Sequence, residues 1–325
     1  MKKYLFIITL GFSFFSFAMQ KKPTNKTTQI PTTQQIRQER PTSQIYSFEA
    51  PEQGEFQTRM DLGLLTGTLK FSTEIQTQRI EGIDTYFSAS YGLTDVLSIG
   101  ARGSYLNSSS GGTVANTSRA SASKAGLGDP EIFLTTRVNP GRMQLYLMMI
   151  AGIMASDFEV DNLRGSTTNS SGAYYVEPKF STSITMGSFL LGGSASYRYH
   201  FNRQVSIISS SGTESLRLDP GNRIRASINS EVLTSYPFGF EIEYLLQDRY
   251  EAFSLSTPGG QKLTFGNTTI LGASAYIRFL TDMGFGNFEL VPWISYQTNV
   301  GKKRGTANVE DDQLMTFILK LQMMF

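Results

Sequence analysis

The sequence predicts an all-β fold, a transmembrane antiparallel up-and-down β-barrel of about twelve strands. Three observations support this prediction. The chain opens with an export signal, and apolar and polar side chains alternate in two-residue steps through most of the remaining chain. The connections between the alternating segments are short and long by turns, as they are in outer-membrane barrels.

Residues 1–18 have the pattern of a bacterial secretory signal peptide. Two lysines follow Met1, and Tyr4–Ala18 holds 15 residues without a charge. Ser16 and Ala18 supply the small side chains of a cleavage site after Ala18. An uncleaved anchor is the less favoured interpretation, because a spanning helix needs roughly 20 apolar residues. We therefore expect export from the cytoplasm of a Gram-negative cell.

Residues 19–66 differ in composition from the rest of the chain. Gln20–Gln57 is rich in Gln, Thr, Pro and Lys, and such a segment buries too little apolar surface to fold alone. We expect 19–66 to be a flexible periplasmic segment and 67–325 to form the barrel. A plug docked inside the barrel is the less favoured alternative, and Met60–Leu65 competes for the role of first ordered piece.

The alternation is clearest at the C-terminus, where every second residue of 315–325 is large and apolar. A strand of this kind has one apolar face and one mainly polar face. Repeating the test along the chain predicts twelve strands, at 67–77, 83–92, 95–106, 129–138, 142–153, 173–186, 188–201, 221–233, 238–248, 268–280, 286–298 and 312–325.

The predicted connections differ in length in a regular way. Short ones fall at 92–94, 139–141, 186–187, 234–237 and 281–285. Long ones, several of them rich in Ser, Gly and Asn, fall near 78–82, 107–128, 154–172, 202–220, 249–267 and 299–311. Short periplasmic turns and long external loops are typical of outer-membrane barrels.

The distribution of charge separates a membrane barrel from a soluble β-sandwich or solenoid. Only 17% of residues are charged, and the presumed outward faces carry almost none of that charge. Aromatic residues gather near both strand ends, as at the two membrane interfaces. We therefore expect outer-membrane lipids and lipopolysaccharide around the barrel. A terminal Phe325 on an alternating strand resembles the sorting signal read by the barrel-assembly machinery, which is a second expected partner.

The opposite strand faces are expected to line the lumen. The predicted lining residues, which form either a pore or a structural network, are Arg102, Glu131, Arg137, Glu177, Lys179, Arg198, Arg223, Arg225, Glu231, Glu241, Glu243, Arg278, Glu289 and Lys320. Charges confined to one face support this register, because a charge facing lipid costs several kcal/mol. The pair Arg223/Arg225 opposite Glu241/Glu243 predicts mutual pairing across neighbouring strands.

Two strings add a family resemblance. They are Tyr91-Gly92-Leu93-Thr94-Asp95, followed by Leu97 and Gly100, and Gly126-Leu127-Gly128-Asp129 before the next predicted strand. Over residues 80–140 they resemble the outer-membrane barrels grouped with the meta-pathway of phenol degradation, a transporter-like family. The resemblance implies a channel for small solutes, with aromatic or hydrophobic compounds as candidates. Gly92 permits a tight turn, Asp95 can bond its backbone, and Gly126 and Gly128 suit close packing at the outer mouth.

An enzyme is the least favoured class. The single histidine, His200, lacks a serine partner in its neighbourhood of the sequence, and Glu310-Asp311-Asp312 is interpreted as a solvated loop or a cation site. No phosphate loop or metal-spaced His/Cys set is present, so we expect no cofactor and no metal. The 29 basic and 27 acidic residues nearly cancel, which argues against nucleic acid as a partner.

The sequence thus predicts a channel for passive uptake or efflux of small solutes. The alternative is a filled structural or surface-adhesive barrel that acts through its external loops. A barrel of about twelve strands lies between the packed eight-stranded barrels and the open porins, so strand number alone leaves both functions open.

Overall fold

The computed structural model describes residues 51–71, 76–114, 117–138, 143–154, 159–161, 165–166, 173–209, 212–219, 221–248, 251–254, 262–264, 268–282, 287–299, 303–304 and 307–324. The predicted signal peptide, residues 19–50 and Phe325 lie outside the described residues. None of the described residues belongs to a helix that is long and apolar enough to cross a membrane.

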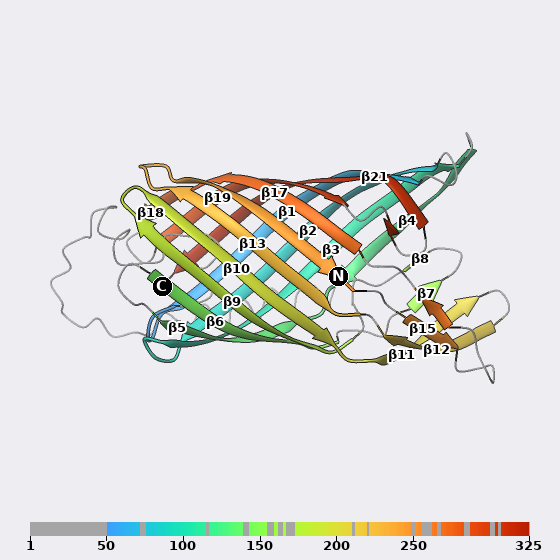
Figure 1. Cartoon of the computed structure of the whole chain (residues 1–325), viewed down its shortest axis with the longest axis horizontal. Helices are drawn as coiled ribbons and strands as arrows, with labels where there is room; N and C mark the ends of the chain where they lie inside the picture. Colours follow the sequence, from blue (N-terminus) through green and yellow to red (C-terminus); the bar gives the residue numbers. More distant parts are fainter. Residues whose placement is uncertain are drawn as a thin grey trace, which may run out of the picture.

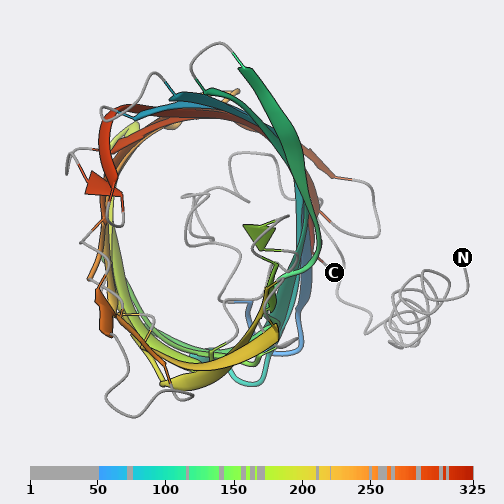
Figure 2. The same cartoon turned by 90° about the vertical axis from the view of Figure 1, so that its right-hand side faces the viewer.

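The antiparallel wall strands close into one ring (Figure 2). The structure describes twelve of them, which confirms the predicted fold class and strand number. β21 pairs with β19 on one side and with β1 on the other, and this double pairing closes the wall. In ring order the wall strands are β1 (Phe56–Phe71), β2 (Gln76–Gly92), β3 (Leu97–Val114), β5 (Glu131–Val138), β6 (Met143–Gly152), β9 (Tyr175–Met186), β10 (Phe189–His200), β13 (Arg223–Val232), β14 (Phe238–Gln247), β17 (Thr268–Ile277), β19 (Asn287–Asn299) and β21 (Ala307–Met324).

Closure has a physical reason. Backbone N–H and C=O groups find no water inside a bilayer, and a ring of strands pairs all of them without leaving an edge. β18 (Phe279–Asp282) continues the line of β17 after Arg278 and pairs with β19, so the wall stays bonded to the short-turn end. At one short turn, Gly187 has φ +61, a conformation that favours glycine and lets β9 turn directly into β10.

Structure extends beyond the wall at the long-loop end (Figure 1). A second sheet contains β7 (Glu159–Asp161), β8 (Gly165–Ser166), β11 (Arg203–Ser209), β12 (Gly212–Asp219), β15 (Glu251–Ser254) and β16 (Lys262–Thr264). β4 (Thr117–Leu127) pairs with the outer half of β3, and the two-residue β20 (Lys303–Arg304) pairs with β21.

Each of the six predicted long loops contains strand residues. The expected loop 107–128 is largely a hairpin of β3 and β4, and the expected loop 78–82 lies inside β2. The expected loop 299–311 overlaps the first residues of β21, including Glu310-Asp311-Asp312. The Ser- and Gly-rich strands of the β3–β4 hairpin look like a loop in the sequence, because their side chains carry no alternation of polarity.

The predicted barrel boundary at residue 67 is also wrong, because β1 begins at Phe56. Phe56, Met60, Leu62 and Leu64 share one face of β1 and carry the alternation that locates it. The Gln-rich composition of the preceding residues conceals this signal. Pairing with β2 over the whole length of β1 stabilises the strand residues that precede the predicted boundary.

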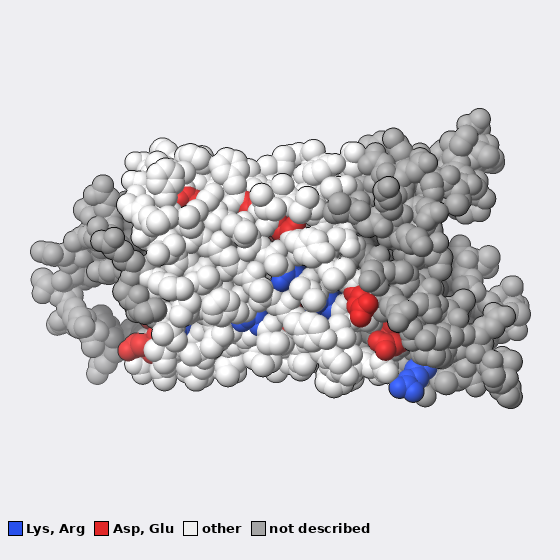
Figure 3. Space-filling model, viewed as in Figure 1, with Lys and Arg blue, Asp and Glu red and all other residues white. Residues whose placement is uncertain are grey.

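The outer face of the barrel is apolar. Many large hydrophobic side chains on this face are exposed, among them Ile228 at 73%, Phe240 at 55% and Leu147 at 55% exposure. Most of the described surface in Figure 3 is uncharged. A water-soluble protein rarely exposes so broad an apolar area, whereas a bilayer would bury it. The wall therefore has the surface of a membrane-spanning barrel.

Candidate functional site

The barrel encloses a cavity of about 460 Å³, and all twelve wall strands contribute to its lining. Six cationic and six anionic side chains line it: Arg59, Arg102, Lys179, Arg198, Arg225 and Lys320, with Asp61, Asp84, Glu131, Glu177, Glu241 and Glu243. The remaining lining is mostly small and polar, with apolar surface from Tyr86, Ile150, Ile318 and Trp293. The cavity lining is therefore rich in charged groups, with equal numbers of each sign.

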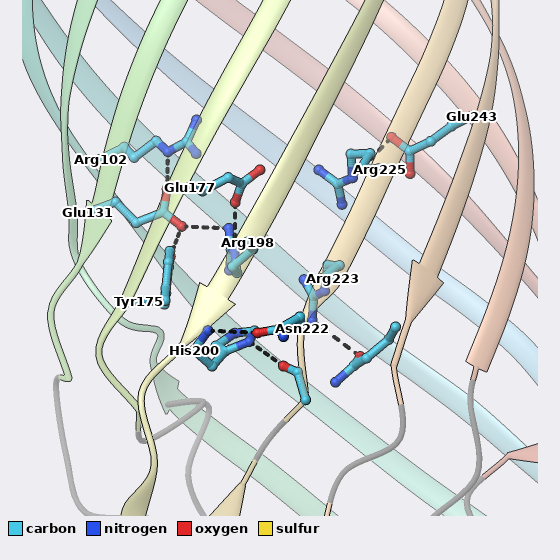
Figure 4. A network of polar contacts seen from close by, with 12 residues as sticks. Arg102, Glu131, Tyr175, Glu177, Arg198, His200, Asn222, Arg223, Arg225 and Glu243 are labelled. Carbon is cyan, nitrogen blue, oxygen red and sulfur yellow. Dashed lines mark hydrogen bonds and ion pairs between the residues drawn. The ribbon is translucent and has the colours of Figure 1, made fainter.

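Ion pairs organise the cavity wall toward the long-loop end (Figure 4). The Nε atom of Arg198 donates to Glu177 at 2.5 Å, and its Nη2 atom donates to Glu131 at 3.2 Å. Arg102 and the Tyr175 hydroxyl also donate to Glu131. The Arg198 guanidinium lies 3.8 Å from the centroid of the Tyr175 ring, which adds a cation–π contact. Glu131 is thus shared by three donors, and Glu177 binds Arg198.

A second network lies nearer the short turns, outside the cavity lining. Arg278 contacts Glu231 at 2.6 Å and also pairs with Glu289, and the Tyr276 hydroxyl donates to Glu231 at 2.8 Å. Glu231 is 0% and Arg278 4% exposed. A charge buried so deeply is stable only when it is paired and hydrogen-bonded. This network therefore has the character of a structural brace.

On the β1–β21 side of the cavity, Lys320 makes a cation–π contact and Arg59 makes an ion pair. Lys320 Nζ lies 3.3 Å from the centroid of Trp293, which stacks on Tyr276 at 4.5 Å. Arg59 pairs with Asp61, two residues along β1, at 2.6 Å. Arg59 and Asp61 fall in the part of the chain that the composition places in the N-terminal segment, and for that reason they are absent from the predicted lining.

The predicted lining residues fall into two groups. Those that line the cavity are Arg102, Glu131, Glu177, Lys179, Arg198, Arg225, Glu241, Glu243 and Lys320. Those on the inner face but outside the cavity lining are Arg137, Arg223, Glu231, Arg278 and Glu289.

The predicted mutual pairing of Arg223/Arg225 with Glu241/Glu243 is correct only in part. Arg225 Nε lies 3.5 Å from Glu243. Arg223 stands opposite Gln247 and bonds its amide oxygen at 3.5 Å, because the register of β13 and β14 places Glu241 opposite Asn229.

Gly92 has a different role from the one expected. A Cβ at Gly92 would lie 1.8 Å from the carbonyl oxygen of Glu52, so Gly92 makes room for the chain that precedes β1. The Gly92 N–H donates to Glu55, and Glu52 pairs with Arg137 at 3.4 Å. Residues 51–55 are thereby fastened to the inner face at the short-turn end.

The other turn motifs can be compared with their expected roles. The hydroxyl of Thr94, rather than the side chain of Asp95, accepts the turn N–H of Leu97 at 3.0 Å, and Asp95 offers its carbonyl to Arg137. Gly128 packs closely, as expected, because a Cβ there would lie 2.3 Å from Ser104 Oγ. Gly126 pairs with Leu106 in the β3–β4 hairpin, and Asp129 follows that hairpin half-buried.

The alternation of polar and apolar residues in the sequence did not predict the apolar patches on the inner face. Phe133, Met148, Ile150 and Tyr175 form a buried cluster, because β6 is apolar on both faces. Three inner glycines receive aromatic rings from the next strand, in the pairs Gly100/Phe133, Gly152/Tyr175 and Gly239/Tyr276. An inward glycine opposite an inward aromatic residue is a signal that could have located these contacts.

His200 ends β10 and is buried at the long-loop end of the wall. Its Nδ1 atom is 2.7 Å from the Gly221 carbonyl oxygen, and its ring meets the edge of Tyr175. The ring is thus held in a structural hydrogen bond. The described residues contain no group of three His, Asp or Glu side chains that could hold a metal ion.

No model of a known protein family matches the chain, and no curated protein matches it. Among solved structures, the chain is similar to an outer membrane channel from Pseudomonas putida F1, with a TM-score of 0.56 and 14% identity over 86% of this chain and 97% of that one. It also resembles a mutant of the TodX monoaromatic hydrocarbon channel, with a TM-score of 0.43 and 9% identity over 85% and 91% of the two chains. For a Pseudomonas aeruginosa FadL homologue the TM-score is 0.42 and the identity 11%, over 86% and 93%.

At 14% identity the first likeness shows a shared fold. Together with the apolar outer wall, it defines the class of this chain as a twelve-stranded β-barrel of the outer-membrane type. The resemblance of residues 80–140 to the phenol-degradation barrels stays a prediction.

Proposed function

We propose that the chain is a channel of the Gram-negative outer membrane through which small solutes pass passively. The observation that carries this proposal is the cavity of about 460 Å³ inside a closed wall. A volume of this order accommodates a small molecule. Balanced charges around it favour a water-filled path that orients a polar solute.

The candidate solutes are small aromatic or hydrophobic compounds, as the resemblance of the turn motifs implies. Trp293, Tyr86 and Ile150 offer apolar surface inside the cavity to such a solute. The proposal includes no catalysis, since His200 is engaged by a backbone carbonyl.

The proposed partners are inferred from the surface of the barrel. Outer-membrane lipids and lipopolysaccharide would cover the apolar wall, on which Leu147, Phe240 and Ile228 are exposed. The barrel-assembly machinery would read strand β21.

One observation favours the alternative of a filled structural or surface-adhesive barrel. The inner side chains near the short turns are closely packed, with Asn229 at 1% and Val291 at 0% exposure. A layer packed to this degree could stop solute flow, and the external loops would then be the working part.

Single-channel recording in planar bilayers distinguishes the two functions. We expect discrete conductance steps from the detergent-purified barrel, altered by benzoate or benzyl alcohol. Boiled protein is the control, and the folded barrel should migrate faster on gels before boiling than after. Stable insertion without conductance would support the filled barrel instead.

A further inference from the structure

Three arginines gather on the inner face of β10 and β13 toward the long-loop end (Figure 4). Arg198 and Arg223 are direct cross-strand partners, and Arg225 follows Arg223 on the same face of β13. We call Arg198, Arg223 and Arg225 the arginine cluster. Like charges placed directly opposite each other destabilise a sheet, so the arrangement needs a compensating interaction.

Among the three arginines of the described cluster, Arg198 has the closest carboxylate partners. Glu177 and Glu131 both bind Arg198, and Glu131 also receives Arg102 and Tyr175. The carboxylates of this network are therefore already shared among other donors. They leave little capacity for a second guanidinium.

Arg223 lacks a carboxylate partner within the described residues. The hydrogen bond that it makes there joins Nη2 to the neutral amide oxygen of Gln247 at 3.5 Å. Its Nε atom is buried and has no hydrogen-bond partner in the described part of the chain. A buried donor of a charged group without a partner costs free energy, and a native structure keeps such a donor for a reason.

The guanidinium of Arg225 is also only weakly paired within the protein. Its side chain is 46% exposed toward the cavity, and its contact with Glu243 measures 3.5 Å. A half-exposed pair at that distance is weak. Leu245 stands directly opposite Arg225 on β14 and is buried, which places an apolar surface beside the guanidinium.

We propose that Arg225, in the lining at the long-loop end of the cavity, and Arg223, beside it on the same face of β13, form a binding site for small monocarboxylates. The inference rests on the proposed channel function and names its solute class. A carboxylate is planar and accepts two parallel hydrogen bonds from a guanidinium, and Arg223 and Arg225 each present one. The body of the solute extends from Arg225 into the cavity of about 460 Å³, which has room for it.

Trp293 provides a readout of binding that does not depend on conduction. It is the only tryptophan of the chain, and it lines the same cavity. Its fluorescence in the detergent-solubilised barrel can be titrated with sodium benzoate. Benzyl alcohol is the matched neutral probe, since it has the same ring without the charge.

We expect benzoate to bind the native barrel more tightly than benzyl alcohol does. Arg223→Gln together with Arg225→Gln should weaken benzoate binding about tenfold or more and change benzyl alcohol binding less than about twofold, because each guanidinium supplies charge-assisted hydrogen bonds to the carboxylate alone. Arg225→Lys should fall between these limits, since lysine keeps the charge and loses the fork.

Arg217→Gln is the matched control. It makes the same substitution at an exposed site on β12, outside the wall, and should bind benzoate as the native barrel does. Gel mobility and circular dichroism check the folding of each variant. If the double variant does not fold, Arg225→Gln alone decides, because loss of a half-exposed side chain costs little stability.

Two results would overturn the proposal. One is benzoate binding no tighter than benzyl alcohol to the native barrel, and the other is a folded Arg225→Gln barrel with native benzoate affinity. Arginine-dependent binding in a barrel that never conducts would instead overturn the channel and leave the binding site standing. Conductance without arginine-dependent binding would overturn the binding site and leave the channel standing.

Discussion

Arg278 lies 2.6 Å from the carboxylate of Glu231 in a part of the barrel interior that solvent does not reach. It pairs at the same time with Glu289, so one guanidinium neutralises two buried carboxylates. Glu231 and Glu289 lie near the short-turn ends of β13 and β19, and Arg278 lies between β17 and β18, so the three side chains link that side of the wall. Its stability should therefore depend strongly on this one arginine.

Replacing Arg278 by methionine should destabilise the barrel by about 3–5 kcal/mol, because both carboxylates lose their partner while buried. The measurement is the free energy of unfolding in urea from lipid vesicles. Arg225→Gln breaks a half-exposed pair and should cost about 1 kcal/mol or less. Equal losses for the two variants would show that the Arg278 network is not a brace.

Gly100→Ala should destabilise the barrel by about 1–3 kcal/mol through overpacking. The added Cβ would lie 2.2 Å from the ring of Phe133 and 2.7 Å from the carbonyl oxygen of Ala89, so both must move. Gly103→Ala on the same strand is the control, because no atom lies within 4 Å of its Cβ position. Urea midpoints of the two variants should differ clearly, and identical midpoints would contradict the packing of Phe133 on Gly100.

Leu147→Arg should cost about 2–4 kcal/mol, because it places a charge on the lipid-facing side of β6 near its middle. Ser274→Arg lies on the lumen side of β17, where water and counter-charges are close, and should be tolerated. Folding yield in vesicles and the free energy of unfolding check both. A barrel that tolerates the two arginines equally would have its faces assigned wrongly.

Deletion of residues 19–50 tests the interpretation of the N-terminal segment as a periplasmic tail. The deletion leaves β1 whole and keeps Glu52, which is paired with Arg137. A free tail predicts unchanged single-channel conductance. A rise in conductance would instead make the segment a plug. Glu52→Ala in the full-length chain separates an effect of fastening from an effect of the tail itself.

Much of the wall is predictable from alternation, and the exceptions have physical causes. The ends of β13 and β14 lie within a few residues of the predicted limits, because lipid selects Ile224, Phe238 and Phe240 on one side and the lumen selects Arg223 and Glu241 on the other. Strand β1 begins earlier than predicted, since its inward polar side chains look like part of a polar tail. The β3–β4 hairpin replaces a predicted loop, because small residues carry no such pattern.

The residues of the candidate site could be predicted from the sequence, but the contacts that they make with one another could not. Period-2 alternation places Arg198, Arg223 and Arg225 on the inner face, and the chain alone suffices for that prediction. Whether Arg223 meets Glu241 or Gln247 depends on the register of β13 against β14. Whether Glu131 binds Arg102, Arg198 or Tyr175 depends on how β3, β5, β6, β9 and β10 are staggered.

The sequence by itself therefore determined the kind of protein: a closed antiparallel barrel of twelve strands, with apolar side chains outside and charges inside. It could do so because the two environments of a barrel wall act on alternate residues of one strand. Only the tertiary structure decided which charges neutralise each other and which remain available to a solute. Ion pairing depends on distances of a few ångströms between strands far apart in the chain, and a pattern local to each strand does not encode them.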